Sequence, residues 1–191
     1  MKTIILDNGH GCNTKGKQGP NYTFGTLREW EFNRDIVDKI AERLDEEGIE
    51  YVILVAEEED VSLATRCRRA NAICKERGVE NCILISVHAN AGHGTGFECF
   101  TSPGETKADR YATIMCEEFQ AEYPHEKLRK DFSDGDPDKE SEFYILMHTI
   151  CPALLTENFF YDNEDDCRKL LDEHHRERIA QYHVNAIRRF V

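Results

Sequence analysis

Two apolar, β-branched runs that each lead to a histidine constrain the fold of this 191-residue chain more than any other feature. Residues 3–6 run toward His10, and residues 82–87 run directly into His88. Short runs of this composition, bounded by turn-forming residues, are typical of buried strands. In an open α/β sheet, both imidazoles would emerge at the strand ends where ligands bind. Because neutral imidazole is a common zinc ligand, the two runs predict a metal site at that edge.

Strand and helix patterns alternate through the first half of the chain. The sequence predicts strands at residues 3–6, 49–55, 82–87, 96–100, 143–146 and 153–156. It predicts helices at residues 27–47, 60–77, 107–122 and 164–190, the second capped by Asp60 or Ser62 and the last in one or two pieces. This order indicates an α/β fold with a twisted, mostly parallel central sheet of about six strands flanked by helices. The length supports one sizeable core, so residues 1–191 are predicted to form a single domain.

Two long polar segments separate these elements. Residues 11–26 contain four glycines and Pro20, and loops of this length in compact domains are often functional. Residues 124–141 are dominated by charge, glycine and proline, which predicts a mobile loop. Its part from 131 to 141 is expected either to cover the ligand site as a lid or to be a disordered acidic loop.

The formal net charge of −13 argues against several kinds of partner. Nucleic-acid binding needs clustered Lys and Arg, so no nucleic-acid partner is expected. The same charge gives no help in approaching an anionic polymer such as a bacterial wall. No apolar run approaches the length of a membrane span, so no membrane insertion is expected. The N-terminal residues lead directly into a predicted strand, and no signal peptide is visible.

The eight cysteines are expected to have free, mostly buried thiols. None forms a Cys-x-x-Cys pair, which argues against a structural zinc knuckle. Several lie in apolar runs and would behave as small buried hydrophobic residues in a reducing compartment. The alternative, which the even count suggests, is a set of disulfides.

The third metal ligand is predicted at the start of the first helix, where Glu29 and Glu31 are the candidates. At about 100° per residue, this helix has an apolar stripe formed by Trp30, Val37, Ile40, Ala41 and Leu44. Glu29 falls at the edge of that stripe, whereas Glu31 points away from it. A carboxylate directed toward a core is costly without a partner, and a metal ion would be such a partner. The alternative is that Glu29 only stabilises the helix N-terminus through the helix dipole.

A fourth candidate is Glu157, which follows the apolar run 152–156 and precedes Phe159 and Phe160. Apolar neighbours would raise the pKa of its carboxyl group by desolvation. A carboxyl group held near neutrality can take a proton from zinc-activated water and return it to a leaving amine. The alternative is an exposed acid at a strand end.

Three further residues are assigned expected environments. His93 is expected to be an exposed loop histidine or a substrate contact. His148 is expected either to line the cleft or to be a hydrogen-bonded core residue. Arg66 is expected to support packing and the strand ends.

These segments, in this order, resemble the zinc-dependent N-acetylmuramoyl-L-alanine amidases of the third amidase class. The similarity runs from Ile4 to about Ile187, nearly the whole chain. Four motifs carry it: Gly9-His10-Gly11, Glu29-Trp30-Glu31-Phe32-Asn33, Ser86-Val87-His88-Ala89-Asn90, and Pro152 through Phe160. Each motif alone is weak, and four in register over this length are a specific signal.

The resemblance implies a hydrolase that cleaves the amide between the lactyl group of N-acetylmuramic acid and L-alanine, in peptidoglycan or muropeptides. It implies one Zn²⁺ ion held by His10, Glu29 and His88. Glu157 would act as general base and then as general acid. Residues 1–191 would be the catalytic domain of a cell-wall amidase or lysin.

Some features depart from the family pattern. Cys12 stands where the family has another small residue, and its thiolate would be able to occupy the open metal position. These residues show no basic wall-binding module of the kind usual in the family, so targeting by another protein or action on soluble fragments is expected. The missing leader suggests a phage-type lysin released by a separate pore, a cytoplasmic recycling enzyme, or the mature form of an exported protein.

Two other functions stay open on the sequence alone. A zinc peptidase acting on a stem peptide would use similar chemistry, but the chain has no His-Glu-x-x-His helix. An inactive amidase-like module that binds muropeptides would not need the three predicted zinc ligands together with Glu157. This chain has all four residues, which argues against such a module.

Overall fold

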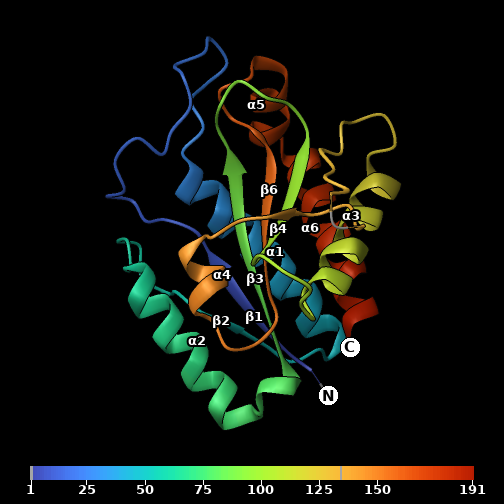
Figure 1. Cartoon of the computed structure of the whole chain (residues 1–191). Helices are drawn as coiled ribbons and strands as arrows, with labels where there is room; N and C mark the ends of the chain where they lie inside the picture. Colours follow the sequence, from blue (N-terminus) through green and yellow to red (C-terminus); the bar gives the residue numbers. More distant parts are fainter. Residues whose placement is uncertain (1, 134) are drawn as a thin grey trace.

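The central element of the fold is a six-stranded sheet (Figure 1), seen in a computed structural model that describes residues 2–133 and 135–191. The strands are β1 (Thr3–Asn8), β2 (Tyr51–Ile53), β3 (Cys82–Asn90), β4 (Phe97–Thr101), β5 (Lys139–Glu140) and β6 (Ala153–Phe160). Their order across the sheet is β2-β1-β3-β6-β4-β5. The β4–β6 pair is antiparallel, and the other four pairs of this sheet are parallel. The predicted fold class is therefore confirmed.

Helices cover both faces of this sheet (Figure 1). One face carries α1 (Glu29–Glu47), α3 (Asp109–Glu122) and α6 (Glu173–Phe190). The other face carries α2 (Leu63–Arg77) and α4 (Tyr144–His148), while α5 (Glu164–Leu171) follows β6 and a short 3-10 turn (Val79–Asn81) precedes β3. Within the described residues, no helix is long and apolar enough to cross a bilayer.

Two hydrophobic cores result because alternate side chains of a strand point to opposite faces. Ile4 and Leu6 of β1 pack into the larger core with α1, α3 and α6, whereas Ile5 packs into the smaller core with α2 and α4. β1 is buried along its whole length. Strands buried on both faces are typical of parallel sheets covered by helices, which explains the near-continuous apolar runs in the sequence.

The helix ends follow the capping signals in the sequence. α1 ends at Gly48, whose φ of +66° is the left-handed conformation that glycine adopts easily. Ser62, not Asp60, caps α2 by accepting a hydrogen bond from the backbone amide of Thr65. The C-terminal helical region is in two pieces, because Asp172 ends α5 and caps α6.

The prediction of a strand at residues 143–146 is wrong, because the chain forms the helix α4 there. Ile145 and Leu146 are buried against α2, while Phe143, Tyr144 and Met147 are exposed. A run of four apolar residues is too short for periodicity to distinguish a strand from a helix. In place of that predicted strand, the sheet contains β5, which lies inside the segment predicted as a mobile loop. β5 pairs with Phe100 and Thr101 of β4. The same segment is also hydrogen-bonded to Phe97 through Lys127 and Arg129.

The prediction of free, mostly buried thiols is confirmed. All eight thiols are free, and seven of them are buried. The buried thiols belong to the two cores, and none of them joins a potential metal cluster among residues 2–133 and 135–191. Cys12, which is exposed, is the exception.

Candidate metal centre and catalytic cleft

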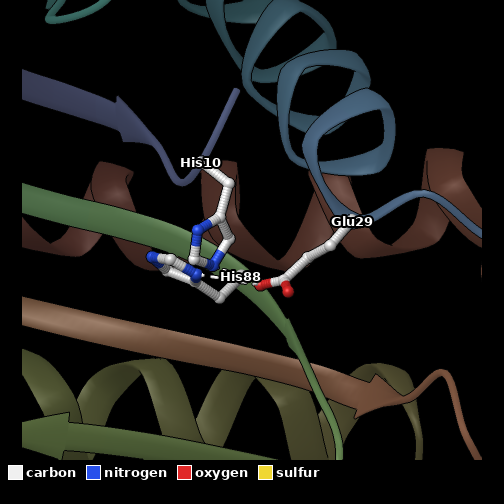
Figure 2. Close-up of side chains that lie close together, drawn as sticks. All are labelled: His10, Glu29 and His88. Carbon is white, nitrogen blue, oxygen red and sulfur yellow. Dashed lines mark hydrogen bonds and ion pairs between the residues drawn. The ribbon is translucent and has the colours of Figure 1, made fainter. Parts of the chain in front are cut away.

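Three side chains from three separate elements meet at one point (Figure 2). His10 lies in the turn after β1, Glu29 is the first residue of α1, and His88 lies near the end of β3. Nε2 of His10 is 3.2 Å from Oε1 of Glu29, and Nδ1 of His88 is 3.0 Å from the same oxygen. One ligand atom from each residue lies within 4.8 Å of the other two. The structure therefore brings together the three residues predicted as metal ligands.

The backbone after β1 turns sharply to aim His10 at the other two residues. His10 has a φ of +65°, a left-handed conformation that costs a non-glycine residue roughly 1–2 kcal/mol. Its carbonyl oxygen accepts hydrogen bonds from Arg34 and Arg66, which hold the turn in place. Gly9 packs against the ring of His88 so closely that a Cβ would lie 2.0 Å from the ring atom Cε1. A side chain at position 9 would displace His88.

Glu29 is buried and faces the two histidines, whereas Glu31 is exposed. Burial raises the pKa of Glu29, but its interactions with His10 and His88 outweigh burial and hold that pKa well below its usual range. Glu29 therefore carries a negative charge at neutral pH. Burial lowers the pKa of His10, whereas at His88 the carboxylates of Glu29 and Glu157 outweigh burial and raise the pKa.

The free atoms of this cluster fit a bound cation. Nε2 of His10 and Oε2 of Glu29 are buried and form no hydrogen bond among the described residues, although Nε2 has an ion-pair contact with Oε1 of Glu29 and Oε2 has one with Lys17. Buried polar atoms without a hydrogen bond are costly unless something binds them. Two imidazoles and one carboxylate form a donor set of catalytic zinc sites. Donor separations of 3.0 and 3.2 Å also agree with the spacing of about 3.3 Å expected around a tetrahedral ion with ligands about 2 Å away.

Glu157 lies next to this cluster on β6, where it is the parallel register partner of His88. Its Oε2 is buried and has no hydrogen-bond partner in the described chain. Desolvation raises the pKa of Glu157 to about 8, and His88 lowers it only in part. The position of Glu157 within the strand differs from the prediction. β6 continues to Phe160, with a bulge beside Phe159 (φ +62°), so Glu157 lies inside the strand and not at its end.

A cleft of about 300 Å³ opens over these residues. His10, His88 and Glu157 line its polar side. Its apolar side comes from the start of α2 and from α4, through Val61, Leu63, Phe143, Tyr144 and Ile145. The described residues of segment 131–141 do not line this cleft, so the lid hypothesis for that segment gains no support, and Asp134 lies outside the described residues.

Three polar residues at the site, Lys17, Asp7 and Ser86, were not predicted from the sequence, whereas Arg66 supports the end of β1 as expected. Lys17 lies in the long loop, and its Nζ is 3.6 Å from Oε2 of Glu29. Asp7, Ser86 and Arg66 form a buried hydrogen-bonded chain that ends on His88. A signal for Ser86 was present, because it precedes His88 by two residues in an otherwise apolar strand and so shares its face. Nothing in the sequence around Lys17 indicated its position.

The remaining candidates lie away from the cluster. His93 is an exposed loop histidine, as one of its two predictions had it, and its Nδ1 lies 3.5 Å from Asp162. His148 is exposed and stacks on Tyr144, so neither of its predicted environments is found. Cys12 is exposed and is not part of the His10–Glu29–His88 cluster.

Comparisons with known proteins agree with this geometry. The sequence profile of a family described as N-acetylmuramoyl-L-alanine amidase matches residues 4–189. The amidase CwlM of Bacillus licheniformis is 32% identical over 194 residues, which cover 99% of this chain and 68% of that protein.

Solved structures of amidases share the fold. The crystal structure of an N-acetylmuramoyl-L-alanine amidase from Clostridium difficile 630 superposes with a TM-score of 0.81 at 23% identity, covering 99% of this chain and 96% of that one. The CwlD amidase from Clostridioides difficile, solved in complex with the GerS lipoprotein, superposes with a TM-score of 0.77 at 21% identity. The match covers 100% of this chain and 98% of that one. With the family profile spanning nearly every residue, this chain belongs to the N-acetylmuramoyl-L-alanine amidase family.

Proposed function

We propose that this chain is a zinc-dependent amidase that cleaves the bond between the lactyl group of N-acetylmuramic acid and L-alanine in peptidoglycan or muropeptides. The observation that supports this most directly is the convergence of His10, Glu29 and His88, whose free buried atoms face one another beside Glu157. Family membership supports the same reaction.

In this proposal His10, Glu29 and His88 hold one zinc ion. A zinc ion bound there supplies Lewis-acid activation of water and of the amide carbonyl. Glu157 takes a proton from the attacking water and returns it to the leaving amine of L-alanine. A carboxyl group performs both transfers well when its pKa is near the working pH, and burial raises the pKa of Glu157 toward that range.

The test combines metal analysis with product analysis. Protein purified without chelators is expected to contain one zinc ion per chain. It is expected to release peptides with a free N-terminal alanine from purified peptidoglycan, as detected by mass analysis. New termini elsewhere in the stem peptide would instead indicate a peptidase. A protein that holds no zinc and hydrolyses nothing would indicate a muropeptide-binding module.

We also infer that a second protein, or release of the substrate as soluble fragments, brings enzyme and substrate together. The net charge of −13 opposes association with an anionic wall polymer. The CwlD structure, which contains the GerS lipoprotein, supports the idea of a protein partner. Binding of the isolated chain to purified wall material is expected to be weak and to increase with salt. Tight binding at low salt would contradict this inference.

A further inference from the structure

A chain of buried polar side chains starts at His88 and ends at α2. Nε2 of His88 lies 3.1 Å from Oγ of Ser86. Oγ of Ser86 donates to Oδ2 of Asp7 at 2.6 Å, and Oδ1 of Asp7 accepts from Nη1 of Arg66 at 2.6 Å. Ser86, Asp7 and Arg66 are each no more than 2% exposed. Buried polar groups of this kind are held rigidly because water cannot replace their partners.

The sheet fixes the positions of these groups. Ser86 precedes His88 by two residues on β3 and therefore points to the same face. Asp7 is the register partner of Ser86 on the neighbouring strand β1. Arg66 also donates to the carbonyl oxygens of Asn8 and His10, so it joins this chain to the turn that carries the other histidine.

The donors and acceptors in this chain determine which nitrogen of His88 carries a proton. Asp7, paired with Arg66, only accepts hydrogen bonds. The single hydroxyl proton of Ser86 is directed at Asp7, which leaves only lone pairs on its oxygen for His88. Nε2 of His88 therefore keeps its proton, and Nδ1, which lies 3.0 Å from the charged carboxylate of Glu29, is the nitrogen left to bind a metal ion. A metal ion there would take the lone pair of Nδ1 in place of the hydrogen bond to Glu29.

We propose that Ser86 and Asp7 are positioning residues that fix the tautomer and ring orientation of His88, so that its Nδ1 is ready to bind the metal ion. This inference rests on the proposed function, because it assumes that His88 is a zinc ligand. Hydrogen-bond partners of this kind typically change metal affinity 10–100-fold when they are removed. The hydrogen bond between His88 and Ser86 also prevents the ring of His88 from rotating away from Glu29. Gly9 packs against the same ring and restricts its movement further.

The experiment measures zinc affinity by competition with a chromogenic chelator. Ser86→Ala is expected to weaken zinc binding about 10–100-fold. Ser86→Thr keeps the hydroxyl group and is expected to restore most of the affinity. The matched control is Thr101→Val, which removes another buried strand hydroxyl bonded to a carboxylate, Asp138, away from the metal site. The control is expected to leave zinc affinity unchanged.

Two further measurements separate positioning from a general effect on folding. If Asp7 acts through Ser86, Asp7→Asn is expected to weaken zinc binding in the natural background but to add little in the Ser86→Ala background. In the zinc-loaded protein, ¹⁵N NMR of His88 is expected to show a protonated Nε2 and a metal-bound Nδ1.

The outcomes distinguish this inference from the proposed function. Natural protein that binds no zinc would contradict both. Natural protein that binds zinc, together with a Ser86→Ala variant of equal affinity, would overturn the inference alone. Additive effects of Ser86→Ala and Asp7→Asn, or zinc bound through Nε2 of His88, would also overturn it.

Discussion

At the residue scale, two glutamates of the same cleft have opposite properties because their neighbours differ. Glu29 contacts two imidazoles, and these interactions hold the pKa of its carboxyl group well below the usual range despite burial. Glu157 has no comparable partner, so desolvation raises its pKa to about 8. Carboxyl groups whose pKa values are pushed apart in this way can divide metal binding and proton transfer between them. This contrast supports Glu29 as the ligand and Glu157 as the proton carrier.

Replacing Glu157 tests its role directly. Glu157→Gln keeps the size of the side chain but cannot accept the proton from water, so kcat is expected to fall roughly 10²–10⁴-fold. Zinc content is expected to stay at one ion per chain, because Glu157 is not among the three converging ligands. The measurements are muropeptide turnover and metal analysis of the same sample. Loss of zinc in this variant would show that Glu157 is a ligand instead.

Gly9 is a second residue whose role can be isolated. A Cβ at this position would overlap the ring of His88, so Gly9→Ala is expected to displace that ligand and to weaken zinc binding at least tenfold. The control is Gly16→Ala in the following loop, where a Cβ meets nothing within 4 Å. Because Gly16 has a φ of +76°, the control is expected to cost about 1 kcal/mol of stability without changing zinc affinity. Equal zinc affinity in the two variants would contradict the steric argument.

At the scale of elements, β6 is held between the cleft and α6 by a second set of polar contacts. The side-chain amide of Asn158 donates to the carbonyl oxygen of His88 at 2.7 Å, and Tyr182 of α6 donates to Asn158. Thr156 of β6 and His183 of α6 are hydrogen-bonded at 3.1 Å. Because side chains alternate along a strand, Thr156 and Asn158 point to α6 while Glu157 points to the cleft. The packing of α6 therefore fixes the strand that carries Glu157.

His183 makes this packing sensitive to acid. Burial lowers the pKa of His183 to about 4, against 6.5 for a free imidazole. Because the pKa of His183 is lower in the folded state than in the unfolded state, only the unfolded chain takes up a proton at this residue between pH 6.5 and 4. The stability of the fold is therefore complete above pH 6.5 and falls as the pH is lowered toward 4. The natural protein is therefore expected to lose about 3 kcal/mol of unfolding free energy from this group between pH 6.5 and 4.

Denaturant unfolding across this pH range measures the effect. His183→Gln is expected to be less stable at pH 7, since it loses a buried ring, but to show a smaller fall in stability between pH 6.5 and 4. His174→Gln, on the exposed side of the same helix, is the control and is expected to keep the natural pH dependence. An unchanged pH dependence in His183→Gln would show that His183 does not titrate in this window.

At the scale of the whole molecule, metal binding and folding are expected to be linked. The three converging side chains come from segments that are far apart in the sequence, and only the folded sheet brings them together. A ligand that binds only the folded state stabilises it, by about 4 kcal/mol when its free concentration is a thousand times its Kd. A cation at this site would also neutralise the buried charge of Glu29 in a chain whose net charge is −13.

Removal of the metal tests this linkage. A chelator is expected to lower the Tm of the natural protein, and added zinc is expected to restore it. Glu29→Gln loses the charged ligand, so its Tm is expected to respond little to either treatment. A natural protein whose Tm is unaffected by chelator and zinc would contradict a metal site built from these residues.

The structure confirmed the sequence-based interpretation where local patterns were strong. The buried runs around Ile4 and Ile83 predicted two central strands, and Gly48 and Ser62 marked helix ends, because each signal depends only on neighbouring residues. The same signals were ambiguous at Phe143, where four apolar residues fit a strand as well as the helix α4. They were absent at β5, a polar edge strand whose position depends on backbone pairing with β4.

The sequence by itself determined the α/β class, placed His10 and His88 toward the ends of two strands and predicted the inward direction of Glu29, because side-chain periodicity places apolar and polar groups on opposite faces. It set the end of the strand before His88 at residue 87, whereas β3 continues to Asn90. Only the tertiary structure decided which polar residues support those ligands. Ser86 meets Asp7 through strand register, Arg66 comes from α2, which covers the face of the sheet to which Ser86 and Asp7 point, and Lys17 comes from a long loop. Contacts between residues distant in sequence depend on how the elements pack, and no local pattern encodes that packing.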